Sequence, residues 1–426
     1  DAYIASGSEF HRDSVVGARF RLMSEPKWQM LGMTEEWADA FGEEVEQRWE
    51  MYAESEECHV DAQRKLTFTG MVRLAVINYV ANQEVLATAQ WIKDKRRVSA
   101  TAILLVDPDR LCTPQEKFNL MYKGLIRGGI ERKPNGEPVA YYIHNDHPAT
   151  ALFTGVYGAT RIAARKPWGR RQVIHISEPT RIDQSRGISQ LTTSIRETKI
   201  GRKFRDVALQ NAVIQATYAA TIESELDTGQ IFAMLGNGSE VDPTQAILNY
   251  IGAYGQAMSD FTAGSKRLAI DGAKIPHLPP GTKLNMQSAG TPGTLGNDFE
   301  GSILRYTAAS LGITYEELTR DLRETNYSSI KAGWNMTQRT MKARKAMVAD
   351  RFANQVFQLW MEEEINNDRF KTLPPSVKER LYDGYTLQAL CGANWFGTGL
   401  GQIDELKETQ AMHQRINNGT SNAKIE

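Results

Sequence analysis

Several features that would point to common protein classes are scarce or missing in this sequence. Its 426 residues include only three cysteines, Cys58, Cys112 and Cys391, which lie far apart and match no zinc-binding spacing. They indicate a reducing compartment and no disulfide framework. No apolar run reaches the length of a membrane span and no signal peptide is visible, so no membrane partner is expected. The formal net charge of -1 argues against a protein that holds nucleic acid tightly by neutralising phosphates.

Catalytic signatures are missing as well. There is no phosphate-binding glycine loop, no dinucleotide fingerprint after a strand and no nucleophile elbow. Two polar pairs, Asp107 with Asp109 and His144 with His147, could suggest a metal site, but neither has a third ligand nearby in the sequence. Polar turns explain both pairs. The sequence therefore predicts no enzyme, no catalytic residue, no metal and no other cofactor.

The most informative stretch that is present runs from 295 to 365. A helix is expected from Asn297 to about Leu311, ended by Gly312 and followed by a charged loop at 314–325. Asn326 or Ser328 can cap a second helix of nearly forty residues. Spacings of three, four and seven place apolar residues on one stripe of each helix. In the first helix these are Phe299, Ile303, Tyr306 and Ala309, and in the second Ile330, Trp334, Met341, Val348, Phe352, Val356 and Trp360.

An additional long helix is predicted from near Ile188, with Ser189 as a plausible N-cap. Its part from 207 to 222 carries no charge at all and is rich in small and amide side chains. Such a surface suits close helix packing, either inside one domain or against further copies of the chain.

The remaining pattern predicts an α+β protein. Residues 34–54 form an amphipathic helix, 68–85 a second one, and 100–187 contain strands at TAILLVDPDR, which ends at a turn, YYIHND and RQVIHIS. Residues 228–294 are rich in glycine and proline and read as a small module inserted between two helices.

Five segments resemble the lambda-type family of tailed-phage portal proteins, in the family's order along the chain. They are VVGARFRLMSEPKWQMLG (15–32), IHISEPTRIDQSRGISQL (174–191), YAATIESELDT (218–228), ILRYTAASLGITYEELTRDLRETNYSSIKAGW (303–334) and ANWFGTGLGQIDELKE (393–408). No single motif is a catalytic signature, but the set together is specific, and the resemblance extends over most of the chain. Since the first residue is Asp1 and not Met, terminal segments of the family are expected to lie outside this sequence.

The resemblance implies the portal fold, in which an α/β wing, a long-helix stem, a small α+β clip, a tunnel loop and a helical crown follow one another. The implied parts are the wing (1–187 and 329–400), the stem helices (188–227 and 295–312), the clip (228–294), the tunnel loop (313–328) and the start of the crown (401–426).

The resemblance also implies which partners the protein binds and where it is located. Copies of the chain would form a ring, typically of twelve, at a capsid vertex within the major capsid protein. Double-stranded DNA would pass through it without sequence recognition, while the terminase large subunit and later the head–tail adaptor dock on the clip. The protein would occur in the virion and, during assembly, in the host cytoplasm.

Candidate functional residues follow from these parts. They are, for the tunnel loop, Glu316, Glu317, Arg320, Asp321, Arg323 and Glu324; for contacts between stem helices, Ala216, Tyr218 and Ala219; and for clip docking, Lys266 and Arg267.

Two alternatives remain open at this point. One is a metal-dependent enzyme acting on nucleic acid, with Asp107, Asp109 and a later glutamate as ligands. The other is a helical scaffold unrelated to phage, which would form no large hollow ring.

Overall fold

The computed structural model describes residues 2–114, 125–150, 158–221, 295–323, 325–397 and 405–420, and a few positions between 252 and 274. The chain divides into two compact units. Unit 1 comprises Asp1–Ser194 and Leu304–Glu426, and unit 2 comprises Ile195–Ile303. Helices and strands are both well represented, as the α+β prediction requires.

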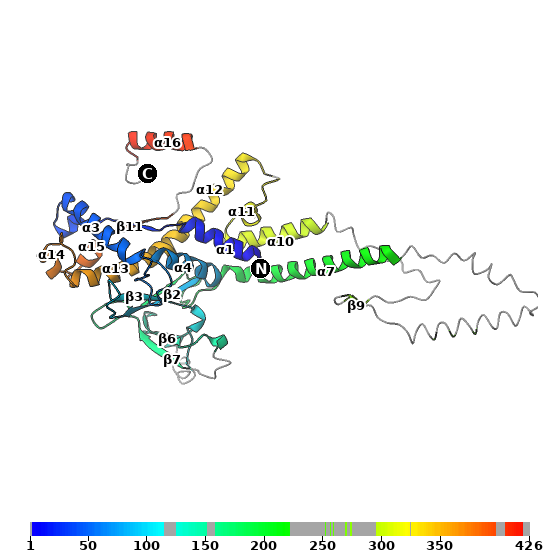
Figure 1. The fold of residues 1–426 in the computed structure, drawn as a ribbon, viewed down its shortest axis with the longest axis horizontal. Coiled ribbons are helices and arrows are strands. Elements are labelled where there is room, and N and C mark those ends of the chain that lie inside the picture. The colour runs from blue at the N-terminus through cyan, green and yellow to red at the C-terminus, as the bar shows by residue number, and fades with distance from the viewer. Residues whose placement is uncertain are drawn as a thin grey trace, which may run out of the picture. The chain divides into compact units, whose positions relative to one another are not determined.

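Unit 1 contains most of the described elements (Figure 1). Its helices are α1 (Ala2–Val15), α2 (Trp28–Leu31), α3 (Glu35–Ala53), α4 (Phe68–Asn82), α11 (Tyr315–Thr319), α12 (Tyr327–Arg344), α13 (Arg351–Asn366), α14 (Pro375–Glu379), α15 (Thr386–Leu390) and α16 (Glu405–Asn417). Its strands are β1 (Arg21–Ser24), β2 (Glu84–Trp91), β3 (Thr101–Val106), β4 (Ile126–Arg127), β5 (Ile130–Arg132), β6 (Pro138–His144), β7 (Ala159–Ala163), β8 (Val173–Ser177) and β11 (Ala393–Phe396).

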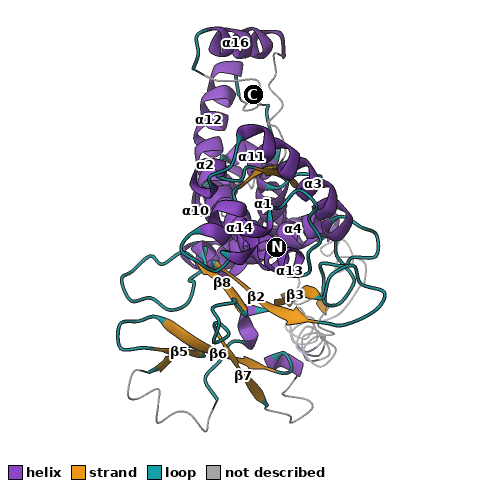
Figure 2. Cartoon of the chain, turned by 90° about the vertical axis from the view of Figure 1, so that its left-hand side faces the viewer, coloured by secondary structure: helices purple, strands orange, loops and turns teal. Residues whose placement is uncertain are grey.

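The strands from β2 to β8 lie beneath the helices in Figure 2, whereas β1 and β11 pair with each other. One antiparallel sheet has the order β3-β2-β8 and another the order β4-β5-β6-β7. Because successive side chains of a strand point to opposite faces, β2 can serve two cores. Val85 and Ala87 belong to the large core with the helices, whereas Leu86 joins Tyr141 and Ile143 in the core between the sheets.

Aromatic rings fill the helical core. Trp49 on α3 lies at its centre, with ring centroids 4.9 Å from Phe68, 5.4 Å from Phe357 and 5.2 Å from Trp360, all edge-on. Edge-to-face pairs of this kind stabilise beyond the area they bury. The predicted amphipathic helix at 34–54 is confirmed as α3, and its N-cap is Thr34, whose hydroxyl accepts from the Trp37 N–H.

The expected forty-residue helix is confirmed as α12 and α13, joined without a break by a π-helical turn at Lys345–Asp350. Its predicted apolar stripe is buried from Met341 onward, through Val348 and Phe352 to Trp360. Near its start, however, Trp334 is exposed. The stripe therefore holds the C-terminal half in the core and leaves the N-terminal half partly uncovered.

Unit 2 consists, within the described residues, of α7 (Ile195–Thr221), most of α10 (Leu295–Leu311) and the strand pair β9 (Ala269–Ile270) and β10 (Ala273–Lys274). The two helices touch through Phe204 and Phe299, whose ring centroids are 5.0 Å apart, and through an ion pair of Arg205 and Glu300 at 3.2 Å.

Two expectations differ from the structure. The helix expected at 68–85 stops at Asn82, because Gln83 adopts a left-handed conformation that caps it, and Val85 already belongs to β2. In α10 the predicted stripe is not the buried one: Phe299, Tyr306 and Ala309 are exposed, while Leu304, Thr307, Ala308 and Leu311 are buried.

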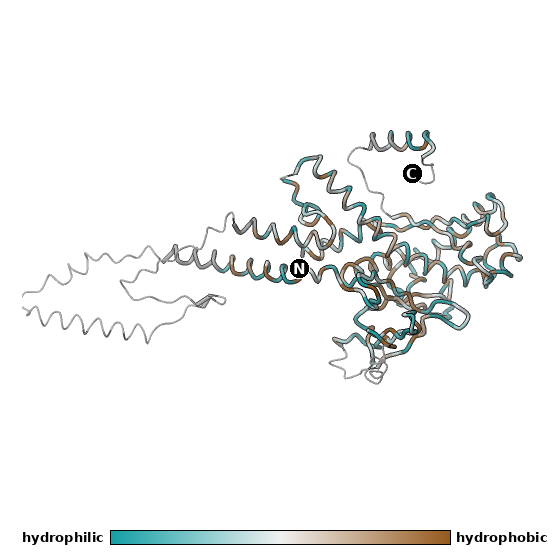
Figure 3. The backbone as a smooth tube through the Cα atoms, turned by 180° about the vertical axis from the view of Figure 1, so that it is seen from behind, coloured by the Kyte–Doolittle hydropathy of each residue, from teal (hydrophilic) through white to brown (hydrophobic). Residues whose placement is uncertain are grey.

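Apolar positions alternate with polar ones along the tube in Figure 3. Among the described helices, none combines the length and the apolar character that crossing a bilayer would need.

Candidate DNA-channel segment and other polar clusters

The segment after α10 begins with a sharp helix end. Gly312 has a φ of 72°, a left-handed conformation that glycine adopts without steric cost, and the Ile313 N–H donates to the Ala308 carbonyl. Ile313 turns into the core against α1. A Cβ on Gly7 of α1 would lie only 2.5 Å from a methyl of Leu311, so a larger residue there would require the Leu311 side chain to shift.

The charged loop expected after Gly312 contains a short helix, α11, that the sequence analysis missed. Thr314 and Glu317 form a capping box, in which the Thr314 hydroxyl accepts from the Glu317 N–H and the Glu317 carboxylate accepts from the Thr314 N–H. The spacing T-x-x-E at 314–317 is the signal that could have revealed it. Glu317 also accepts from the Thr337 hydroxyl at 2.7 Å, and Leu318 is buried. One side of α11 is thus fixed to α1 and α12 (Figure 1).

The outward part of the segment is its tip, from Arg320 to Arg323. Arg320 is exposed and has a φ of 58°, which is uncommon for a residue with a side chain. Asp321 accepts two hydrogen bonds from the Arg323 guanidinium, at 2.9 and 2.6 Å. That contact lowers the pKa of Asp321 to about 2. Leu322 between them is 56% exposed and was not among the predicted residues.

Asn326 restarts the helix, as predicted. Its side chain accepts from the Ser329 N–H at 2.9 Å, and Ser329 completes a second capping box. The tip is therefore held at both ends by caps. The charges that extend from it without serving a cap are Glu316, Arg320 and the Asp321–Arg323 pair. Glu324 lies outside the described residues.

A second polar cluster tests the metal alternative. The structure brings Asp107, Asp109 and His147 together, with ligand atoms within 4.8 Å of one another, so the third ligand that the sequence pattern lacked is His147. His144 is not part of it and faces the Gly158 carbonyl instead. The His147 Nδ1 accepts from the Ala149 N–H. Its Nε2 faces the two carboxylates at 3.8 and 4.0 Å. Exposed acidic groups are common in polar turns without an ion, so this cluster by itself does not favour the enzyme alternative.

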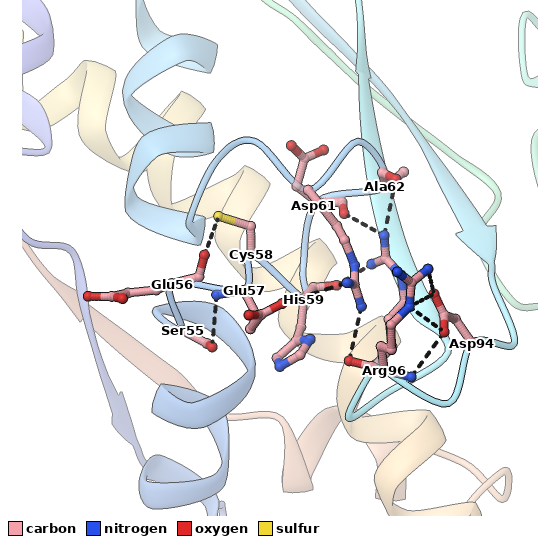
Figure 4. A network of polar contacts seen from close by, with 11 residues as sticks. Ser55, Glu56, Glu57, Cys58, His59, Asp61, Ala62, Asp94 and Arg96 are labelled. Carbon is pink, nitrogen blue, oxygen red and sulfur yellow. Dashed lines mark hydrogen bonds and ion pairs between the residues drawn. The ribbon is translucent and has the colours of Figure 1, made fainter.

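A third cluster fixes the loop between α3 and α4 (Figure 4). The Arg97 guanidinium donates to the carbonyls of His59, Asp61 and Ala62. The Cys58 thiol donates to the Glu56 carbonyl, and burial raises the pKa of that thiol. Since a reactive cysteine needs a lowered pKa, this cluster is structural.

Comparison with known proteins identifies the family. The family described as "Phage portal protein, lambda family" matches residues 1–345. The "Portal protein" of Escherichia phage N15 is 35% identical over 422 residues, which are 99% of this chain and 77% of that protein. The "Portal protein B" of Escherichia phage lambda is 34% identical over 422 residues, 99% of this chain and 76% of that protein. The chain belongs to the lambda family of phage portal proteins.

A solved structure described as "Virion of native gene transfer agent (GTA) particle" also aligns with this portal chain. The alignment covers 99% of this chain and 86% of that chain. With 11% sequence identity and a TM-score of 0.38, the likeness is too weak to support an argument.

The remaining predicted site residues of the portal chain are only partly placed. Ala216, Tyr218 and Ala219 lie on the described backbone of α7, but their side chains are outside the described part. Lys266 and Arg267 are outside the described residues altogether.

Proposed function

We propose that this portal chain assembles into a ring, with twelve copies as the expected number, at a single capsid vertex, where it serves as the conduit for double-stranded DNA. The observation that carries the proposal is the 34–35% identity to two portal proteins over 99% of the chain. In this role it is a structural component of the virion that assembles in the host cytoplasm, is surrounded by the major capsid protein and has no active site.

The exposed side chains of α7 support assembly with further copies. Along its described first half, Ile200, Val207 and Leu209 are 46, 53 and 69% exposed, although α7 is 27 residues long. A long helix gains most of its stability from packing its apolar side chains, and these three on the described half of α7 are largely uncovered in a single chain. Neighbouring copies of the stem helices 188–227 and 295–312 would cover them.

The size of such a ring suits a conduit. Helices pack about 8–10 Å apart, so twelve of them describe a circle of radius roughly 17 Å at their axes. Subtracting a helix half-width of about 5 Å leaves a lumen roughly 24 Å wide. A double helix can pass through it without contact to its base edges, so recognition is independent of sequence.

The overall charge suits a protein through which DNA moves, and not one that binds DNA tightly. Tight, salt-dependent binding needs many phosphate contacts from lysine and arginine, and here basic and acidic residues nearly cancel. At the tip of the proposed tunnel loop, 313–328, the Arg323 charge is balanced by Asp321. Arg320 is then the cation that can make brief phosphate contacts.

The first test replaces both tip arginines by alanine. Arg320→Ala with Arg323→Ala is expected to leave ring formation intact, because neither side chain serves a cap, and to reduce the length of DNA packaged or retained in filled heads. The single change Arg320→Ala should account for most of the effect. The measurement is packaged DNA length in purified particles. Full-length genomes at wild-type yield from the double variant would exclude a role for these arginines.

The second test addresses the ring. Ala216→Arg or Ala219→Arg, beside Tyr218 in the uncharged part of α7, is expected to place an unpaired charge at every contact between stem helices. Such a charge costs several kcal/mol unless it reaches water, so folded monomers should replace rings. Native mass spectrometry and negative-stain microscopy count the copies. Normal rings from both variants would contradict this placement of the interface.

The clip, 228–294, is proposed as the docking surface for the terminase large subunit and then for the head–tail adaptor, with Lys266 and Arg267 among its contacts. The start of the crown at 401–426 and the wing at 1–187 and 329–400 complete the assignment.

A further inference from the structure

A half-open pocket of about 170 Å³ lies in unit 1, away from the proposed tunnel loop. Three segments form it: the hairpin turn between β7 and β8, the middle of α13, and the stretch around α15. Its volume is that of roughly five or six water molecules, given about 30 Å³ for each in the liquid. One side chain with part of its backbone therefore fits, and a folded domain or a duplex does not.

The charge of this pocket is strongly unbalanced. Arg165, Arg170 and Arg171 line it against a single acid, Glu362. Glu362 is already engaged, because Arg170 donates to it at 2.6 Å and the Tyr382 hydroxyl donates to it at 3.1 Å. Within the described part of the chain neither Arg165 nor Arg171 forms an ion pair, although the exposed Glu137 lies within electrostatic reach of Arg165.

These two arginines also face each other across the hairpin. Arg165 and Arg171 are directly opposite in an antiparallel bridge, and like charges in that arrangement repel. Arg165 donates only to the Gly169 carbonyl. The Arg171 side chain has no hydrogen bond or ion pair to any described residue, and burial, together with repulsion from Arg165, lowers its pKa. A negatively charged group between them would offset the burial of the Arg171 charge and the repulsion between the two arginines.

Gln355, an uncharged residue on α13, sets a second requirement for a molecule that binds in the pocket. Gln355 lines the same pocket, and its Oε1 is buried and receives no hydrogen bond from the described residues. Buried acceptors are normally satisfied, so an occupant should bring a donor as well as a negative charge. A peptide with an acidic side chain has both, since its backbone N–H lies next to its carboxylate. Phosphate diesters carry no such donor.

We infer that this pocket binds an acidic peptide segment of a partner protein, with the Arg165–Arg171 pair holding a carboxylate and Gln355 accepting from the adjoining backbone N–H. Leu359 and Leu387 supply apolar contact, and Trp168, which is 62% exposed, stands at the rim. The site is independent of the DNA channel and does not depend on the proposed function.

The test uses the whole chain and a fluorescein-labelled peptide of alternating glycine and glutamate, followed by fluorescence anisotropy. Saturable binding is expected, and Arg171→Gln should weaken it at least tenfold. Arg127→Gln is the matched control, because Arg127 is exposed on β4 and is not part of the pocket. That control should change binding less than twofold. Gln355→Leu, which removes the acceptor without changing charge, should weaken binding severalfold.

Further measurements make the result decisive. Arg171→Gln should unfold at the same or a higher temperature than the parent, because it removes an unpaired and repelled charge, so lost binding cannot reflect misfolding. The inference is overturned if the peptide does not bind saturably, if a glycine–glutamine peptide binds equally well, or if Arg171→Gln leaves the affinity unchanged. Displacement of the peptide by inorganic phosphate or by a single-stranded oligonucleotide at equal charge concentration would overturn the choice of a peptide as the occupant.

Discussion

Glu363→Ala is expected to lower the free energy of unfolding of unit 1 by about 3 kcal/mol, because each buried donor left without an acceptor costs about 1–3 kcal/mol. Glu363 is 3% exposed on α13, and its carboxylate accepts from the Ser99 hydroxyl at 2.5 Å and from the N–H groups of Ala100 and Thr101 at 2.8 and 2.7 Å. Alanine would leave all three donors buried without an acceptor.

The same contact makes stability depend on pH. Burial by itself would raise the pKa of Glu363, but the hydrogen bonds from Ser99, Thr101 and Ala100 outweigh it and hold the pKa below its ordinary value. A carboxyl with a depressed pKa in the folded state stabilises the fold above its unfolded pKa, and that contribution is lost as the pH falls through the folded value. Glu363→Ala should therefore flatten the acid limb of the stability curve.

Urea unfolding followed by tryptophan fluorescence suits this measurement, because Trp49 and Trp360 lie in the adjoining core. Glu379→Ala is the control, since Glu379 is exposed at the end of α14 and should change stability by no more than about 0.5 kcal/mol. A loss below 1 kcal/mol for Glu363→Ala, similar to the control, would show that the carboxylate is not needed at this junction.

The second large effect is expected at His11, which is fully buried on α1. The Arg344 guanidinium lies 2.9 Å from its Nε2, and the Met341 sulfur lies 3.2 Å from its Nδ1. Burial, followed by the charge of Arg344, lowers the pKa of His11 to about 3. The other arm of Arg344 donates to Gln190 at 2.6 Å, just before the chain enters α7. A neutral His11 therefore belongs to a packed cluster of unit 1 that includes Arg344 and Gln190.

The lowered pKa of His11 determines whether stability rises or falls with pH. The unfolded chain protonates His11 near pH 6.5, whereas the folded chain resists protonation down to about pH 3, so stability falls as the pH drops below 6.5. The contribution of this one group between pH 7.5 and 5 is about 2 kcal/mol, from 1.36 kcal/mol per pKa unit. His11→Gln, which stays neutral and keeps an acceptor for Arg344, should remove that part of the slope.

The comparison is the change in unfolding free energy from pH 7.5 to 5 in His11→Gln and in His413→Gln. His413 is exposed on α16, so its replacement should leave the slope unchanged. If the parent and His11→Gln lose the same stability over this range, His11 does not control the acid sensitivity of this cluster.

The features that the sequence by itself determined are local ones, such as helix caps and the apolar stripe of a helix. Asn326 caps a helix as predicted, because a cap joins side chain and backbone within three residues. The stripe from Met341 to Trp360 is buried as predicted, because its period is that of a helix. The ordered motifs led to the portal family, which is confirmed. Where local prediction failed, as for α11, the missed signal was again local: the capping box of Thr314 and Glu317.

What only the tertiary structure decided were the contacts between distant segments. His11 and Arg344 are 333 positions apart, and Ser99 and Glu363 are 264 apart. A repeating pattern of residues along the chain therefore cannot predict either contact. The strand pairing that sets Arg165 opposite Arg171, and the fold that carries both beside α13, depend on how the sheets pack. The same holds for His147, which reaches Asp107 and Asp109 only when the chain has folded. Spacing along a chain specifies neighbours within one helix or hairpin, whereas these partners are chosen by burial and topology.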